Sequence, residues 1–155
     1  MQFSRSKRHG RIRIIRGNLA VDRRGKLTFV NSFSFKGVKR FYQVKNASIR
    51  TIRAFHGHMK EAKYVYVSSG SIMLAAVFLD NPASPSKNSP VHRMTLSDKK
   101  PMVVYIPPGF ANGFRALEKR TAVLFFSTTS LKESLADDYR YAFDYWGKNV
   151  WNNSQ

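Results

Sequence analysis

The sequence predicts an all-β protein, an antiparallel β-barrel followed by one short C-terminal helix. Short runs rich in β-branched and aromatic residues recur along the chain, and turn signals such as Ser69-Gly70 separate them. No long helical pattern lies between these runs. Closely spaced strands without intervening helices favour an antiparallel barrel or sandwich over a parallel α/β sheet.

The chain of 155 residues is 43% hydrophobic and contains 12 Phe and 7 Tyr, which indicates a folded core. We expect one domain over residues 1–155, since no linker or internal repeat divides the sequence. Within it, residues 1–16 form a basic N-terminal strand or arm. Residues 130–155 form a C-terminal helix and an aromatic tail.

The first predicted element is an edge strand, because Arg11, Arg13 and Arg16 are interleaved with isoleucines. Further strands are predicted at 26–31, 38–45, 49–56, 63–67, 71–79, 101–106 and 121–127. Segment 80–90 has three prolines and three serines, which predicts a surface loop. Ser130, with Glu133 three residues later, predicts the start of the helix.

The composition excludes several classes of protein. The chain has no cysteine, which rules out disulfides and thiolate chemistry and suits a reducing compartment. No apolar run approaches the roughly 20 residues of a membrane span, and the basic N-terminus lacks the apolar core of a secretion signal. We therefore expect a soluble, cytoplasmic protein that does not enter a membrane.

The formal net charge of +18 favours polyanionic partners. Part of the charge lies in the basic N-terminal run, from Arg5 to Arg16, and part is scattered along the strands. It is not concentrated on one helix or among stacking aromatics, so it does not favour nucleic acid as the partner. A solvated basic face and a surface that attracts a diphosphate both remain open.

The segment Arg53-Ala54-Phe55-His56-Gly57-His58 carries the strongest chemical signal. His56 and His58 are two residues apart on a predicted strand, so their side chains point to the same face. If that face lines a barrel, both imidazoles converge on one interior site. The spacing alone is compatible with a metal site or with proton transfer.

A second patterned segment is Ile106-Pro107-Pro108-Gly109-Phe110-Ala111-Asn112. Proline fixes φ and glycine allows a positive φ, so the Pro-Pro-Gly step predicts a tight turn after a strand. This turn delivers Asn112 to the start of the following strand.

Together, the two segments resemble the conserved motifs of the cupin superfamily, over about residues 38–127. In metal-binding cupins these motifs supply the ligands, and the equivalent positions here are His56, His58, Lys63 and Asn112. A protonated lysine has no lone pair to donate, and an asparagine is a weak ligand for transition metals. The resemblance therefore implies a jelly-roll barrel without a metal or other cofactor.

Two branches of the superfamily are similar to this chain. Arg53-Ala54-Phe55-His56, Lys63 and the Pro-Pro-Gly segment resemble the dTDP-4-dehydrorhamnose 3,5-epimerases. Lys39-Arg40-Phe41-Tyr42 and the paired histidines resemble the sugar 3,4-ketoisomerases. The epimerases have a tyrosine acid where this chain has Phe126 and a histidine where it has Asn112.

The resemblance implies a metal-independent isomerase or epimerase of a nucleotide-linked 4-keto-6-deoxy sugar, of dTDP type, in surface polysaccharide biosynthesis. His56 would remove a proton beside the ketone, Lys63 would stabilise the enolate oxygen, and His58 would orient His56 or carry the proton. Substrate contacts are expected from the residues that face the pocket on the resembling strands: Arg53, Arg40, Tyr42, Asn112 and Phe126.

Some alternatives remain. A non-catalytic cupin that binds a sugar nucleotide or a partner protein is also compatible with the substituted motif positions. Asp137 and Asp138 could pair with a pocket histidine or form a solvated helix end. The resemblance also implies a homodimer, and the aromatic tail could pack on the barrel or on a second subunit.

Overall fold

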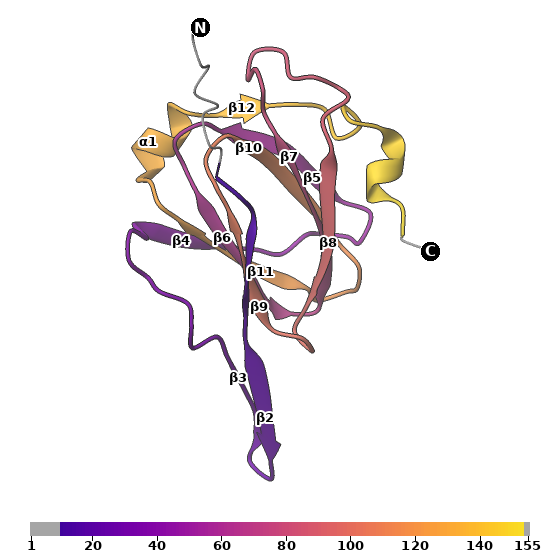
Figure 1. The fold of residues 1–155 in the computed structure, drawn as a ribbon. Helices are drawn as coiled ribbons and strands as arrows, with labels where there is room; N and C mark the ends of the chain where they lie inside the picture. Colours follow the sequence, from indigo (N-terminus) through magenta and orange to yellow (C-terminus); the bar gives the residue numbers. More distant parts are fainter. Residues whose placement is uncertain (1–9, 154–155) are drawn as a thin grey trace, which may run out of the picture.

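A computed structural model describes residues 10–153, and its main feature is a pair of antiparallel sheets that face each other (Figure 1). The first sheet has the order β1-β9-β6-β11-β4, with bounds Arg13–Arg16, Met102–Ile106, Lys63–Ser69, Ala122–Ser127 and Arg40–Val44. The second has the order β12-β5-β10-β7-β8, with bounds Tyr139–Arg140, Ile52–His58, Phe110–Ala116, Ser71–Phe78 and Val91–Ser97. A hairpin of β2 (Asn18–Asp22) and β3 (Gly25–Phe29) projects away from the sheets (Figure 1).

This architecture confirms the predicted antiparallel all-β fold of jelly-roll type. One detail differs from the prediction, because within residues 10–153 the two sheets are not hydrogen-bonded to each other along their edges. The fold is therefore a sandwich of two sheets and not a closed barrel.

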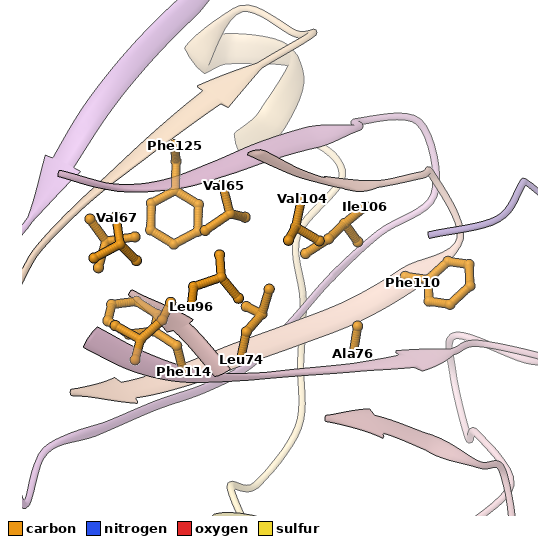
Figure 2. Close-up of a cluster of buried hydrophobic side chains, with 12 residues drawn as sticks. Val65, Val67, Leu74, Ala76, Leu96, Val104, Ile106, Phe110, Phe114 and Phe125 are labelled. Atoms are coloured by element: carbon orange, nitrogen blue, oxygen red, sulfur yellow. The ribbon is translucent and has the colours of Figure 1, made fainter. Parts of the chain in front are cut away.

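The main core fills the space between the sheets (Figure 2). Val65, Val104 and Phe125 of the first sheet face Leu74 and Phe114 of the second, and all five are almost fully buried. This is the alternation expected of strands that bury one face.

A second core lies on the outer face of the second sheet, where the C-terminal tail covers it. Met73 and Val77 of β7 and Phe55 of β5 pack there against Trp146 and Trp151. Strand β7 is thus buried on both faces, which explains why its sequence is apolar nearly throughout. The aromatic tail therefore packs on the sandwich, as one of the two alternatives predicted.

The predicted edge strand is confirmed as β1, which ends the first sheet. Residues 1–9 of the expected basic arm lie outside the described part of the chain. The sequence did not predict β2, β8 or β12, and it predicted only the start of β10. Strand β8 is an edge strand, and the polar pair His92-Arg93 interrupts the alternation of apolar and polar residues near its start.

The predicted C-terminal helix is confirmed as α1, Leu131–Leu135. The Ser130 hydroxyl accepts a hydrogen bond from the Glu133 amide and the Glu133 carboxylate accepts one from the Ser130 amide, which is a capping box. After β12 the tail ends in a short 3₁₀-helix, η1, Lys148–Trp151. Within residues 10–153, no helix is long and apolar enough to cross a membrane.

The predicted loop 80–90 is confirmed, and the tail holds it at several points. The Tyr141 and Tyr145 hydroxyls donate to the carbonyls of Pro82 and Pro85, each at 2.6 Å. The indole N–H of Trp146 donates to the Ser86 carbonyl at 3.0 Å. The same aromatic residues that cover the second sheet therefore anchor this loop.

Candidate active site

A cavity of about 240 Å³ opens between the sheets, beside α1 and β12. The first sheet and α1 contribute part of its wall: Tyr42, Val44, Lys63, Phe125, Ser134 and Leu135. The second sheet, together with Asp138 just before β12, contributes the rest: Arg53, His56, His58, Asn112, Gly113, Phe114, Asp138 and Arg140. All the predicted site residues except Arg40 and Phe126 therefore line one cavity.

His56 lies on β5 between Asn112 of β10 and Arg140 of β12, which are its register partners. Burial lowers the pKa of His56, and the nearby Lys63 ammonium lowers it further, while the Asp138 carboxylate opposes this shift. The ring is therefore neutral at neutral pH, the form in which imidazole accepts a proton.

His58 points to the same face but is held by the protein at both ring nitrogens. Its Nδ1 lies 2.5 Å from the main-chain oxygen of Asp137, and its Nε2 lies 3.2 Å from Oε2 of Glu61. Its side chain is only 8% exposed. Both partners are acceptors, so a neutral ring donates its single N–H to one of them at a time. Because both nitrogens face protein oxygens, this arrangement suits an orienting role better than proton transfer to a substrate.

Lys63 reaches the cavity from the opposite sheet, as the first residue of β6, and is 8% exposed. Burial lowers the pKa of Lys63, while the negative charges of Glu61 and Asp138 oppose that shift. An ammonium in such a setting is a strong donor to a developing oxyanion.

Tyr42 and Arg53 supply further polar groups to the wall. The Tyr42 ring stacks on Phe125, with 5.1 Å between centroids and 10° between planes. Burial, with the Glu61 charge, raises the pKa of Tyr42 to about 12. Arg53 is oriented by Asn46, because its Nε donates to the Asn46 side-chain oxygen at 2.7 Å.

Two predicted contacts need correction. Phe126 points to the outer face of the first sheet and packs against Phe33, with 5.6 Å between centroids, so it does not line the cavity. Its neighbour Phe125 faces inward instead, because successive side chains of a strand point to opposite faces. Arg40 is not a lining residue either, since its guanidinium lies over the Tyr42 ring and pairs with Glu61 at 3.3 Å.

The structure adds Arg140 and Asp138 to the site. The two side chains form an ion pair at 3.0 Å and sit beside His56 because β12 pairs with β5. The sequence signal for Asp138 is weak, a pair of aspartates after the helix, and nothing in the sequence singles out Arg140. Glu61 was also missed, although it contacts His58 directly.

The donor set favours an anionic ligand over a cation. Among residues 10–153, no group of three or more His, Asp and Glu side chains is arranged to hold a metal ion. The cations Arg53, Lys63 and Arg140 instead line the cavity. Guanidinium and ammonium groups are suited to phosphate and to oxyanions.

The sequence pattern of the family described as dTDP-4-dehydrorhamnose 3,5-epimerase matches residues 11–143, most of the chain. This chain belongs to that family. The match covers both sheets, α1 and the β12 segment, so every lining residue of the cavity lies within it.

The chain is also similar to a curated protein. The spore coat polysaccharide biosynthesis protein SpsL of Bacillus subtilis is 28% identical over 94 residues, which are 60% of this chain and 61% of SpsL. The chain therefore matches less than two thirds of that curated relative.

Two solved structures share the fold. The dTDP-4-dehydrorhamnose 3,5-epimerase of Sulfolobus tokodaii superposes with a TM-score of 0.70 at 24% identity, over 86% of this chain and 78% of that one. A variant of the 3,4-ketoisomerase QdtA from Thermoanaerobacterium thermosaccharolyticum, in complex with TDP-4-keto-6-deoxyglucose, gives a TM-score of 0.64 at 18% identity, over 87% and 91%.

Proposed function

We propose that this epimerase-family protein is a metal-independent isomerase or epimerase of a nucleotide-linked 4-keto-6-deoxy sugar in polysaccharide biosynthesis. The observation that carries the proposal is the meeting of His56 and Lys63 in one cavity from opposite sheets. Membership of the family and the likeness to SpsL support the substrate class and the pathway.

The proposed chemistry begins with a C–H bond next to the sugar ketone. His56 is neutral at working pH and takes this proton, which leaves an enolate. Lys63 donates to the enolate oxygen, where charge develops, and so lowers the barrier. His58 fixes the position of β5 relative to Asp137 and Glu61, since its two ring nitrogens contact the main-chain oxygen of Asp137 and the carboxylate of Glu61.

Inversion at carbon needs a proton donor on the face opposite the base. Tyr42 lies on the first sheet, whereas His56 lies on the second, and both line the cavity. The raised pKa of Tyr42, caused first by burial, keeps its phenol protonated. We assign to Tyr42 the return of a proton to the opposite face.

The sugar nucleotide also needs a site for its diphosphate. Arg53 and Arg140 line the cavity and lie on strands β5 and β12, which pair with each other. Both are well placed in the proposal to bind phosphate oxygens, because a guanidinium can donate two parallel hydrogen bonds. In this proposal Arg140 replaces Arg40, which the sequence predicted as a substrate contact.

We further propose a homodimer in the cytoplasm. The outer face of the first sheet carries exposed aromatic rings, including Phe35 at 63% and Phe41 at 68%. These rings pack with Phe126 and form an apolar surface that a second copy would cover. The cytoplasmic location rests on the cysteine-free sequence.

The test is proton NMR of dTDP-4-keto-6-deoxyglucose with the protein in heavy water, beside a His56→Ala control. Exchange at C3 and C5 with inverted products would identify an epimerase, and movement of the ketone to C3 would identify a ketoisomerase. No exchange with wild-type protein would contradict the proposal for this sugar.

A second candidate is a non-catalytic protein that binds a sugar nucleotide or a partner protein. This candidate is favoured by Phe125, the ring that β11 directs into the cavity, because a phenylalanine cannot donate a proton as the tyrosine on this strand of the epimerases does. Saturation-transfer NMR in the same sample separates the two: a bound nucleotide without exchange would support binding alone.

A further inference from the structure

Glu61 is the most deeply buried carboxylate near the site, with a side chain that is 0% exposed. It lies in the turn between β5 and β6, and the sequence gives no sign of its importance. Burying an ionised carboxylate is costly unless charges and hydrogen bonds compensate it. The turn therefore places a negative charge behind the cavity for which the fold must provide partners.

Its two oxygens collect partners from several elements. Oε1 lies 3.3 Å from Nη2 of Arg40 on β4 and accepts a short hydrogen bond from Ser127 on β11. Oε2 lies 3.2 Å from Nε2 of His58 on β5 and accepts a hydrogen bond from the Ser134 hydroxyl of α1 at 3.1 Å. One carboxylate thus ties both sheets to the helix that closes the cavity.

The turn that presents Glu61 is itself fixed by Asp137. The Asp137 carboxylate accepts hydrogen bonds from the amides of Met59, Lys60 and Glu61, at 2.9, 2.8 and 3.3 Å. The next residue after Asp137 is Asp138, which lines the cavity near His56. The hydrogen bonds of Asp137 therefore position both Glu61 and the part of the cavity wall that Asp138 forms.

Lys63 lies close to this cluster. It is the register partner of Ser127, whose hydroxyl donates to Glu61. The cavity holds the Lys63 ammonium with little solvent, at 8% exposure, so a nearby negative charge strongly affects it. Arg40, the guanidinium paired with Glu61, acts on Lys63 in the opposite sense.

We propose that Glu61 is a positioning residue of this site: it locks His58 and Arg40 in place and supplies the counter-charge for the buried ammonium of Lys63. The effect of Glu61 on catalysis rests on the proposed function. The effect of its charge on Lys63 does not depend on any substrate. Glu61 does not line the cavity, so it acts on the site through its neighbours Lys63, His58 and Arg40.

The other charges around Lys63 set the background for a test. The charged and titratable groups that face Lys63 come from β4, the β5–β6 turn, β5 and the β12 segment: Arg40, Glu61, His56, His58 and Asp138. Glu61 and Asp138 favour the ammonium, and Arg40 disfavours it. Removing the Glu61 charge alone should therefore lower the pKa of Lys63.

The experiment is NMR titration of the protein labelled with ¹⁵N-lysine, with the Lys63 signal identified by its absence in Lys63→Met. In Glu61→Gln we expect the Lys63 midpoint to move down by about one pH unit, the size typical of losing one nearby opposite charge. Ser127→Ala is the matched control, because it removes a hydrogen bond to the same carboxylate and keeps the charge. Its midpoint should stay at the wild-type value.

Activity gives a second readout. The alkaline limb of kcat/KM should move to lower pH in Glu61→Gln and stay in place in Ser127→Ala. An unmoved Lys63 midpoint in folded Glu61→Gln, or an equal shift in Ser127→Ala, would overturn the proposal. If wild-type protein shows no turnover, the proposed function fails, while the NMR titration still decides the role of Glu61.

Should Glu61→Gln not fold, the double variant Arg40→Met/Glu61→Gln replaces it, because it removes the buried carboxylate together with its guanidinium partner. Its Lys63 midpoint should lie below that of Arg40→Met, from which it differs only by the Glu61 charge. Equal midpoints in these two variants would overturn the proposal.

Discussion

The Nδ1 atom of His58 lies 2.5 Å from the main-chain oxygen of Asp137, whereas His56, on the same strand face, lines the cavity beside Asp138. Strand β5 thus carries two histidines with different environments. The structure holds one of them at both ring nitrogens and leaves the other as the base in the proposed reaction.

This difference predicts a split between two matched variants. His56→Asn should reduce solvent deuterium exchange into the sugar by about 10³-fold, within the usual range for losing a general base. His58→Asn should retain most of the exchange but reduce the free energy of unfolding, by about 1–3 kcal/mol, because Glu61 loses a buried partner. Exchange rates and urea unfolding check both, and equal loss of exchange in the two variants would contradict the assignment.

The pH dependence follows from His56 and Lys63. The pKa of His56 is lowered by burial first and by Lys63 second, so the neutral base persists below pH 6.5 and the acid limb of kcat/KM lies below that value. Lys63→Met removes a positive charge, so it should move the acid limb to higher pH and reduce kcat by about 10²–10³-fold. Lys63→Arg keeps the charge and should leave the limb in place. An acid limb that does not move in Lys63→Met would refute this coupling.

The histidine motif could be predicted from sequence because a strand has a period of two, so His56 and His58 had to share a face. Phe126 could not be placed as safely. A register shift occurs between Ala122 and Val123 where β11 pairs with β6, and a one-residue uncertainty in a strand exchanges its inner and outer faces.

Other parts of the site depend on contacts between distant segments. Arg140 and Asp138 reach the cavity because a two-residue strand docks on β5, and the tail that follows is anchored by Trp146 and Trp151. Glu61 is defined by partners that are far away in sequence, such as Ser134. Neither periodicity nor local spacing carries such information.

Tyr42 should matter for inversion but not for proton removal. Tyr42→Phe keeps the stack on Phe125 and deletes the phenol, so deuterium should still enter from the His56 face while inverted product falls by about 10²-fold. NMR of the sugar in heavy water follows both signals at once. Phe125→Leu is the control, because it disturbs the stack and keeps the hydroxyl. Undiminished inversion by Tyr42→Phe would remove the tyrosine from the mechanism.

Arg140 should contribute to binding. Arg140→Gln removes one charge-assisted contact to phosphate, so KM should rise by about tenfold with kcat nearly unchanged. The affinity for dTDP alone, measured by calorimetry, should fall by a similar factor. Lys99→Gln removes the same charge at a site outside the cavity and should change neither value. Equal effects of the two variants would indicate a general charge effect.

Gly113 should be required for the shape of the site. Strand β10 bulges against β5 between Asn112 and Phe114, and a Cβ built on Gly113 would lie 2.3 Å from the Ala54 Cβ and 2.8 Å from the Arg53 oxygen. Because these atoms belong to the strand that carries His56, the clash cannot be relieved by a side-chain rotation. Gly113→Ala should therefore lower the free energy of unfolding by about 1–3 kcal/mol and reduce the exchange activity as β5 is displaced.

The double variant Ala54→Gly/Gly113→Ala tests this cause. It removes the nearest atom of the clash but leaves the contact with the Arg53 oxygen, so we expect stability to return only in part. Thermal unfolding compares the single and double variants, with Ala54→Gly alone as the reference. If Gly113→Ala unfolds like wild type, the close approach of β10 to β5 at this bulge is not what holds His56 in position.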